Sequence, residues 1–138
     1  MTAEKILIVE DDIADVGGTI DLLEIEGIQA DVVASVRDAE ESLRKRCYQV
    51  LLVDWTLPVI EDGPADTDGG GKLIQSLEAG RLGNLNTDIP IFVLTKQTDQ
   101  FDSQRRSQTR AIPVLSKLDA LTIVARVVGA LAKPKAAA

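Results

Sequence analysis

Short apolar runs alternate along the chain with longer segments whose apolar residues recur at helical spacing. The runs rich in branched aliphatic residues predict five strands, at 5–9, 29–34, 50–54, 89–95 and 111–116. The first, third and fourth runs are almost wholly apolar, as expected of parallel strands that are covered on both faces. The second run alternates more, so we expect it at an edge of the sheet.

The segments between these runs carry helical patterns. They predict helices over 12–26, 35–47, 70–80, 98–109 and 119–133. Ser35 and Asp38 form a capping box at the start of the second helix, and Gly27 stands where a left-handed residue would end the first. The alternation of strands with helices predicts an α/β fold with a parallel sheet.

Length, charge and composition exclude several classes of protein. The 138 residues predict one domain, residues 1–138, with a core over about 5–132 and a tail at 133–138. One cysteine and no histidine exclude an intramolecular disulfide, a His-based zinc site and Ser-His or Cys-His catalysis. A formal net charge of −7 argues against nucleic acid and membrane partners and favours a small cation. No apolar run approaches a membrane span, so we expect a cytoplasmic protein.

Polar residues stand at the ends of four predicted strands, and the carboxyl ends of parallel strands meet along one edge. These residues are Glu10, Asp11, Asp12, Asp54, Thr95 and Lys117. Clustered carboxylates repel each other unless they share a divalent cation, and Mg²⁺ prefers oxygen ligands. The set predicts a magnesium-assisted phosphoryl acceptor in which Asp54 is the nucleophile. Lys117 and the metal would neutralise the phosphoryl oxygens, and the Thr95 hydroxyl would donate a hydrogen bond to one of them.

The motifs "ILIVEDD", "LLVDWTLP", "VLT" and "VLSK", in this order, resemble those of the response regulator receiver domain of two-component signalling. The resemblance covers about residues 5–132. It implies the flavodoxin-like fold, a doubly wound five-stranded parallel sheet of order 2-1-3-4-5 with helices on both faces. It also implies that Thr95 is the switch hydroxyl and that Lys117 is the family's site lysine.

The resemblance further implies a metal site and an acceptor. Asp54 takes the place of the phosphoacceptor, and the family's acidic pair falls on Glu10 and Asp11. Asp11 is then expected to bind Mg²⁺ directly and Glu10 through water. The backbone carbonyl of Thr56, two residues after the acceptor, completes the implied set of Glu10, Asp11, Asp54 and Thr56.

Three residues depart from the family pattern near this site. Leu118 follows the lysine where a proline is usual, which leaves the geometry of that loop open. Val114 replaces a common aromatic residue and excludes an aromatic switch. Lys96 stands where a small residue is usual, and it either crowds or further neutralises the phosphoryl site.

The connection over residues 55–69 is unusually long for a compact domain. It is either a lid or partner-binding element beside the site, or a flexible insertion. The "GGGK" at its end does not match a P-loop, because Asp66 and Leu73 stand where that motif needs a glycine and a hydroxyl residue.

These features favour a stand-alone receiver that accepts a phosphoryl group from the phosphohistidine of a sensor histidine kinase or a histidine phosphotransfer protein. Its output would be binding to an effector protein, through the surface of the fourth helix, fifth strand and fifth helix. It would assist its own phosphorylation without being a turnover enzyme. An interaction module that works without phosphorylation remains the alternative, whereas a dehalogenase-type phosphohydrolase is disfavoured because Thr56 replaces its second aspartate.

Overall fold

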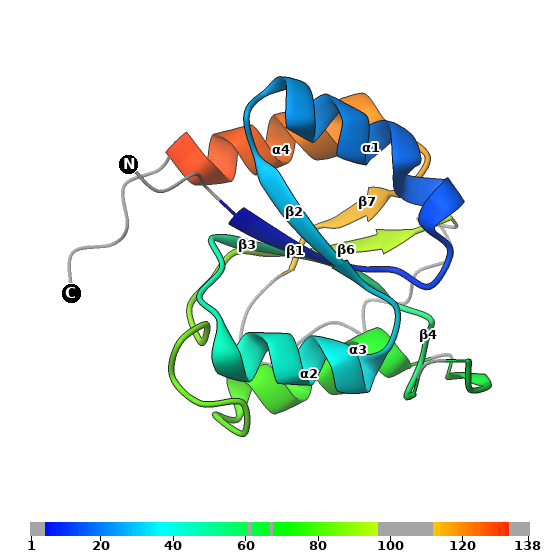
Figure 1. Ribbon diagram of the computed structural model, residues 1–138, viewed down its shortest axis with the longest axis vertical. Helices are drawn as coiled ribbons and strands as arrows, with labels where there is room; N and C mark the ends of the chain where they lie inside the picture. The colour runs from blue at the N-terminus through cyan, green and yellow to red at the C-terminus, as the bar shows by residue number, and fades with distance from the viewer. Residues whose placement is uncertain (1–4, 61, 67, 97–111, 133–138) are drawn as a thin grey trace.

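A five-stranded parallel sheet forms the middle layer of the computed structural model, which describes residues 5–60, 62–66, 68–96 and 112–132 (Figure 1). The strands are β1 (Lys5–Val9), β2 (Gln29–Val33), β3 (Val50–Asp54), β6 (Ile91–Thr95) and β7 (Val114–Ser116). They lie in the order β2-β1-β3-β6-β7 and pair in parallel throughout. This is the predicted order 2-1-3-4-5, so the predicted fold is confirmed, with β2 at an edge.

Helices cover both faces of the sheet (Figure 1). One face packs against α1 (Ile13–Ile25) and α4 (Ala120–Ala132), and the other against α2 (Val36–Lys45) and α3 (Gly69–Glu78). The predicted helix over 98–109 lies outside the described residues. Within the described ranges, no helix combines the length and apolar character that crossing a bilayer requires.

The apolar side chains of the central strands form two separate hydrophobic cores, because successive side chains in a strand point to opposite faces of the sheet. Leu7 and Val53 belong to the core beneath α2 and α3. Ile8 and Leu52 belong to the core beneath α1 and α4. Both faces of β1 and β3 are therefore buried, and polar side chains stand at the ends of these strands.

Several element boundaries differ from the predicted ones. The second helix ends at Lys45 rather than at residue 47, because Arg46 takes up extended backbone angles. The fourth strand begins after Pro90, which has no N–H to donate, although its carbonyl accepts a hydrogen bond from the Leu51 N–H. Gly27 has a φ of 77° after α1, as predicted for the left-handed residue there.

The predicted loop over 55–69 contains a short antiparallel hairpin. Its strands are β4 (Leu57–Pro58) and β5 (Ala65–Asp66). The Arg37 N–H at the start of α2 donates to the Val59 carbonyl at 2.9 Å, which joins the hairpin to the helix layer. The helix α3 then begins at Gly69, inside the predicted loop.

Candidate functional site

A buried ammonium group lies among carboxylates at the carboxyl ends of the strands. Lys117, which follows β7, places its Nζ 2.9 Å from Asp54 Oδ2 and 3.1 Å from Glu10 Oε1. Glu10 follows β1 directly and is 0% exposed, while Asp54 ends β3 and is 6% exposed. Three strand ends thus bring three of the predicted site residues into direct contact.

The charges in this cluster shift each other's protonation. Burial, followed by the neighbouring Asp54 carboxylate, raises the pKa of Glu10 to about 8, although Lys117 opposes the shift. Burial alone would lower the pKa of Lys117, but its hydrogen bonds and charge interactions with Asp54 and Glu10 outweigh burial and raise that pKa. Lys117 therefore stays charged at neutral pH, and the cluster favours an additional cation.

Three carboxylates at this edge are close enough to share a metal ion. Oxygen atoms of Glu10, Asp11 and Asp54 all lie within 4.8 Å of one another. Asp11 is exposed while the other two are buried, so the group opens to solvent on one side. An all-oxygen donor set that leaves room for water fits Mg²⁺, which binds proteins through few carboxylates and keeps several waters.

The remaining predicted site residues lie at the same edge. Thr56 is exposed, and its N–H donates to Asp54 Oδ1 at 3.2 Å, so each oxygen of that carboxylate has a partner. Thr95 ends β6, one residue beyond the partner of Asp54 in the sheet register. Its carbonyl accepts a hydrogen bond from the Lys117 N–H at 3.0 Å, which fixes the backbone of the lysine against β6.

Sequence reasoning missed one residue of this cluster, Asp15 in the first turn of α1. Its Oδ2 lies 3.2 Å from the Nζ of Lys117 and 3.1 Å from the Nζ of Lys96. The hydrogen bond from Lys96, and after it the contact with Lys117, lowers the pKa of Asp15 despite some burial. An acidic residue in the first turn of the helix after β1 was the available signal, but nothing in the sequence tied it to the two lysines.

The three consecutive glycines pack α3 against the end of β3 and the residues that follow it. A Cβ at Gly70 would lie 2.3 Å from the carbonyl oxygen of Asp54, and one at Gly71 would lie 2.6 Å from the ring of Trp55. The Gly70 N–H donates to the Trp55 carbonyl at 2.8 Å, and the Trp55 indole N–H donates to Asp68 Oδ1 at 3.1 Å. The glycines therefore allow a close approach of two backbones.

Two other residues that depart from the family pattern are Leu118 and Val114. Leu118 is 66% exposed directly after the site lysine. Val114, in place of an aromatic residue, is half-buried and packs against the core beneath α2 and α3. Neither side chain contributes a polar group to the cluster.

Comparison with solved structures gives several receiver domains. A Francisella response regulator receiver domain has a TM-score of 0.70 at 18% identity and covers 92% of this chain and 95% of its own. The chemotaxis response regulator CheY4 of Vibrio cholerae has a TM-score of 0.69 at 21% identity, with coverages of 91% and 99%. The receiver domain of a sensor histidine kinase from Pseudomonas aeruginosa PAO1, with a magnesium ion in its active-site cleft, has a TM-score of 0.65 at 21% identity, with coverages of 93% and 99%.

At identities of 18–21%, the structural likeness establishes the fold. Membership of a family rests on a sequence match. A comparison with curated proteins gave no match. The sequence model of the response regulator receiver domain matches residues 6–128, which is most of the chain. The chain therefore belongs to the receiver domain family of two-component response regulators.

Proposed function

We propose that Asp54 accepts a phosphoryl group from the phosphohistidine of a sensor histidine kinase or a histidine phosphotransfer protein. An Asp54 oxygen attacks the phosphorus, the P–N bond to the histidine breaks, and its electron pair returns to the imidazole. The products are an aspartyl phosphate and a free histidine on the partner. The observation that carries this proposal is the 2.9 Å contact between Asp54 Oδ2 and the buried Lys117 ammonium, beside two further carboxylates.

Several surrounding residues compensate the negative charge of the phosphoryl group. Lys117 neutralises negative charge on the phosphoryl oxygens, and the Thr95 hydroxyl donates a hydrogen bond to one of them. Glu10, Asp11, Asp54 and the Thr56 carbonyl are the groups that would hold Mg²⁺. When bound, Mg²⁺ supplies further positive charge to the phosphoryl oxygens. The magnesium in the cleft of the Pseudomonas receiver domain supports this assignment by analogy.

The output of the domain is a change in protein binding, and the domain does not act as a turnover enzyme. The described part of the output surface includes apolar side chains that are open to solvent on α4 and the loop before it. Leu118 is 66% exposed, Leu121 is 74% exposed and Val128 is 38% exposed. These residues suit an effector protein with an apolar face.

The proposed exchange with a histidine kinase places the domain in the cytoplasm.

A second candidate is an interaction module that works without phosphorylation. Val114 supports it, because a half-buried valine cannot act as the rotating aromatic that the family pattern usually supplies. The Asp15–Lys117 ion pair supports it as well, because the site lysine already has a further anion as partner.

Intact mass measurement distinguishes the two candidates. The protein is incubated with Mg²⁺ and acetyl phosphate and then weighed. We expect a gain of one phosphoryl group in the wild type and in Asp62→Asn, a control in the exposed turn of the hairpin, and no gain in Asp54→Asn. Absence of any gain in the wild type would favour the phosphorylation-independent module. A gain that persists in Asp54→Asn would refute Asp54 as the acceptor.

A further inference from the structure

Asp15 contacts the phosphoryl site without being one of the residues that the family pattern implies. A single oxygen, Oδ2, lies between two ammonium groups, 3.1 Å from Lys96 and 3.2 Å from Lys117. The side chain of Asp15 is only 16% exposed, so water screens these contacts incompletely. The same Lys117 ammonium lies 2.9 Å from the acceptor oxygen of Asp54, so one lysine serves both carboxylates.

The sheet register places the two lysines side by side. Thr95 pairs with Ser116, and each of these residues is followed directly by a lysine, Lys96 after β6 and Lys117 after β7. The Lys117 side chain is 8% exposed, while that of Lys96 is 52% exposed. Two neighbouring ammonium groups repel each other unless an anion lies between them. Asp15 occupies that position in the structure.

We propose that Asp15 is an internal counter-ion that competes with the phosphoryl group on Asp54 for the ammonium groups of Lys117 and Lys96. Before phosphorylation, Asp15 neutralises both lysines. A phosphoryl group on Asp54 carries more negative charge than Asp15 and draws the ammonium groups toward itself. Lys96 then becomes a second cation at the phosphoryl group. The inference rests on the proposed function, because it needs Asp54 to carry the phosphoryl group.

Competition and a purely structural ion pair predict opposite changes in the affinity for a phosphoryl analogue when Asp15 is replaced. If Asp15 only tied α1 to the end of β6, its removal would loosen the site and weaken the binding of a phosphoryl analogue. If Asp15 competes, its removal releases both ammonium groups and strengthens that binding. In this account Asp15 is a positioning residue that acts through the lysines, without touching the reacting atoms.

The test is the affinity of the full chain for beryllofluoride, a tetrahedral analogue of the phosphoryl group, at saturating Mg²⁺. We expect Asp15→Asn to bind it about fivefold more tightly than the wild type, because charge-assisted hydrogen bonds become available to the analogue. The matched control is Asp21→Asn, which removes the same charge six residues later on α1. In the described part of the chain, Asp21 forms no ion pair with either lysine. We expect its affinity to change by about twofold or less, since Asp21 is exposed and screened by salt.

A second variant tests the contribution of Lys96 and does not depend on Asp15→Asn. We expect Lys96→Met to bind beryllofluoride about threefold more weakly, because it loses one charge-assisted contact. In the Lys96→Met background, Asp15→Asn should gain less than it does alone, which a double-mutant cycle measures. The control is Lys45→Met, which removes an exposed lysine paired with Glu41 on α2 and should leave the affinity unchanged.

The outcomes separate this inference from the proposed function. Failure of the wild type to bind beryllofluoride would contradict both. Binding by the wild type, with Asp15→Asn no tighter than Asp21→Asn, would overturn the competition and leave the proposed function standing. Unchanged binding by Lys96→Met would overturn the role of Lys96 as the second cation.

Discussion

Two clusters of charged side chains on this sheet have opposite balances of charge. In the first, which we call the Lys117 cluster, one buried ammonium group contacts the carboxylates of Glu10, Asp15 and Asp54 at 2.9–3.2 Å. With Lys96, which pairs with Asp15, and Asp11, which lies beside Glu10 and Asp54, the cluster brings four carboxyl groups against two ammonium groups. The burial of Glu10, together with the neighbouring Asp54, raises the pKa of Glu10 to about 8.

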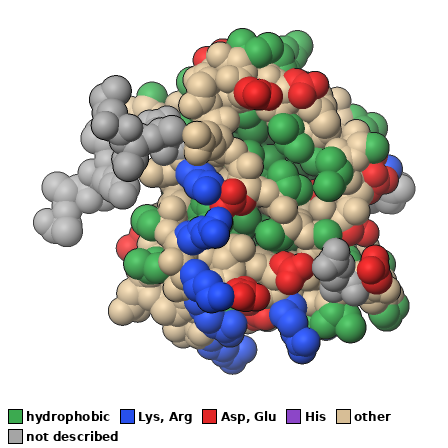
Figure 2. All heavy atoms as spheres, in the orientation of Figure 1, with side chains coloured by type: hydrophobic (Ala, Val, Ile, Leu, Met, Phe, Trp, Pro, Cys, Tyr) green, Lys and Arg blue, Asp and Glu red, His purple; other side chains and the backbone are tan. Residues whose placement is uncertain are grey.

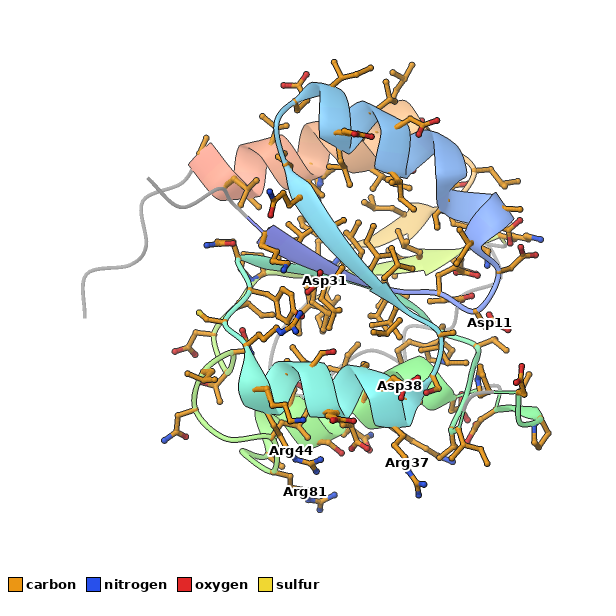
Figure 3. The ribbon with its side chains drawn as sticks, in the orientation of Figure 1. Asp11, Asp31, Arg37, Asp38, Arg44 and Arg81 are labelled. Carbon is orange, nitrogen blue, oxygen red and sulfur yellow. The ribbon has the colours of Figure 1, made fainter. Side chains whose placement is uncertain are left out.

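The second, which we call the Asp31 cluster, has one carboxylate and an excess of donors. Asp31 on β2 accepts a hydrogen bond from the Tyr48 hydroxyl at 2.7 Å and pairs with Lys5 at 3.2 Å and Arg46 at 3.3 Å. Figure 2 shows Lys and Arg side chains over the C-terminal end of α2. Arg46 directly follows this helix and is exposed. Figure 3 shows Asp31 well away from Asp11, which lies beyond the end of β1.

The difference in charge balance shows which of the two clusters is able to bind a ligand. The carboxylate of the Asp31 cluster is fully compensated by its own chain, so this cluster needs no ligand and contributes to stability. The Lys117 cluster is short of positive charge, and one of its neighbours, Asp11, is open to solvent. Of the two clusters, the Lys117 cluster is therefore the one where we expect a cation to bind.

Removing Lys117, the buried cation of the Lys117 cluster, has the largest expected effect on stability. Lys117→Met leaves the buried carboxylates of Glu10 and Asp54 without their partner. We expect the free energy of unfolding to fall by about 3 kcal/mol, as it does when one partner of a buried ion pair is lost. Urea denaturation at pH 7 measures this change. A loss no greater than that of the exposed control Lys45→Met would show that the cluster does not depend on Lys117.

In the Asp31 cluster the largest expected effect comes from Tyr48, which is 1% exposed. Tyr48→Phe keeps the ring and removes only the hydroxyl that donates to Asp31. We expect the free energy of unfolding to fall by about 1.5 kcal/mol, since hydrogen bonds to charged groups are worth about this much. Phosphorylation by acetyl phosphate should not change. A variant that keeps its stability but loses phosphorylation would contradict the division between the two clusters.

Acid should weaken the Asp31 cluster, and this is the smallest expected effect. Burial raises the pKa of Asp31, but the hydrogen bonds from Tyr48 and Lys5 outweigh burial and bring that pKa below its ordinary value. A carboxyl group of this kind stabilises the fold above its unfolded pKa of about 3.9 and loses that contribution as the pH falls through the folded value. Below about pH 4, the wild type should therefore lose stability more steeply than Asp31→Asn. Parallel curves from urea denaturation across this range would rule out the contribution.

The strand order was implied by the resemblance to receiver domains, whereas most of the Lys117 cluster was predicted for one physical reason. Parallel strands end at a common edge, so Asp54 and Lys117 could be placed together although they are far apart in the chain. The assignments of Glu10, Asp11, Thr56 and Thr95 to particular roles stay predictions.

Other features of the structure could not be predicted, because they depend on contacts between residues that are far apart in the sequence. The Asp31 cluster joins residues from β1, β2 and the segment before β3, and their pairing requires the folded sheet. Asn86 is 1% exposed and accepts a hydrogen bond from the Tyr48 N–H at 2.8 Å, yet its sequence context resembles an ordinary polar loop. Likewise, the pattern predicted a helix from residue 70, but the close approach of Gly70 and Gly71 to Asp54 and Trp55 depends on how α3 packs.

The central claim is that Asp54 becomes the phosphorylated residue, and locating the aspartyl phosphate tests it most directly. The protein is treated with Mg²⁺ and acetyl phosphate, reduced with borohydride, which converts an aspartyl phosphate to homoserine, and mapped by peptide mass spectrometry. The account predicts homoserine at position 54 and at no other aspartate. Homoserine at a different aspartate, or none in a protein that remains folded, would contradict it.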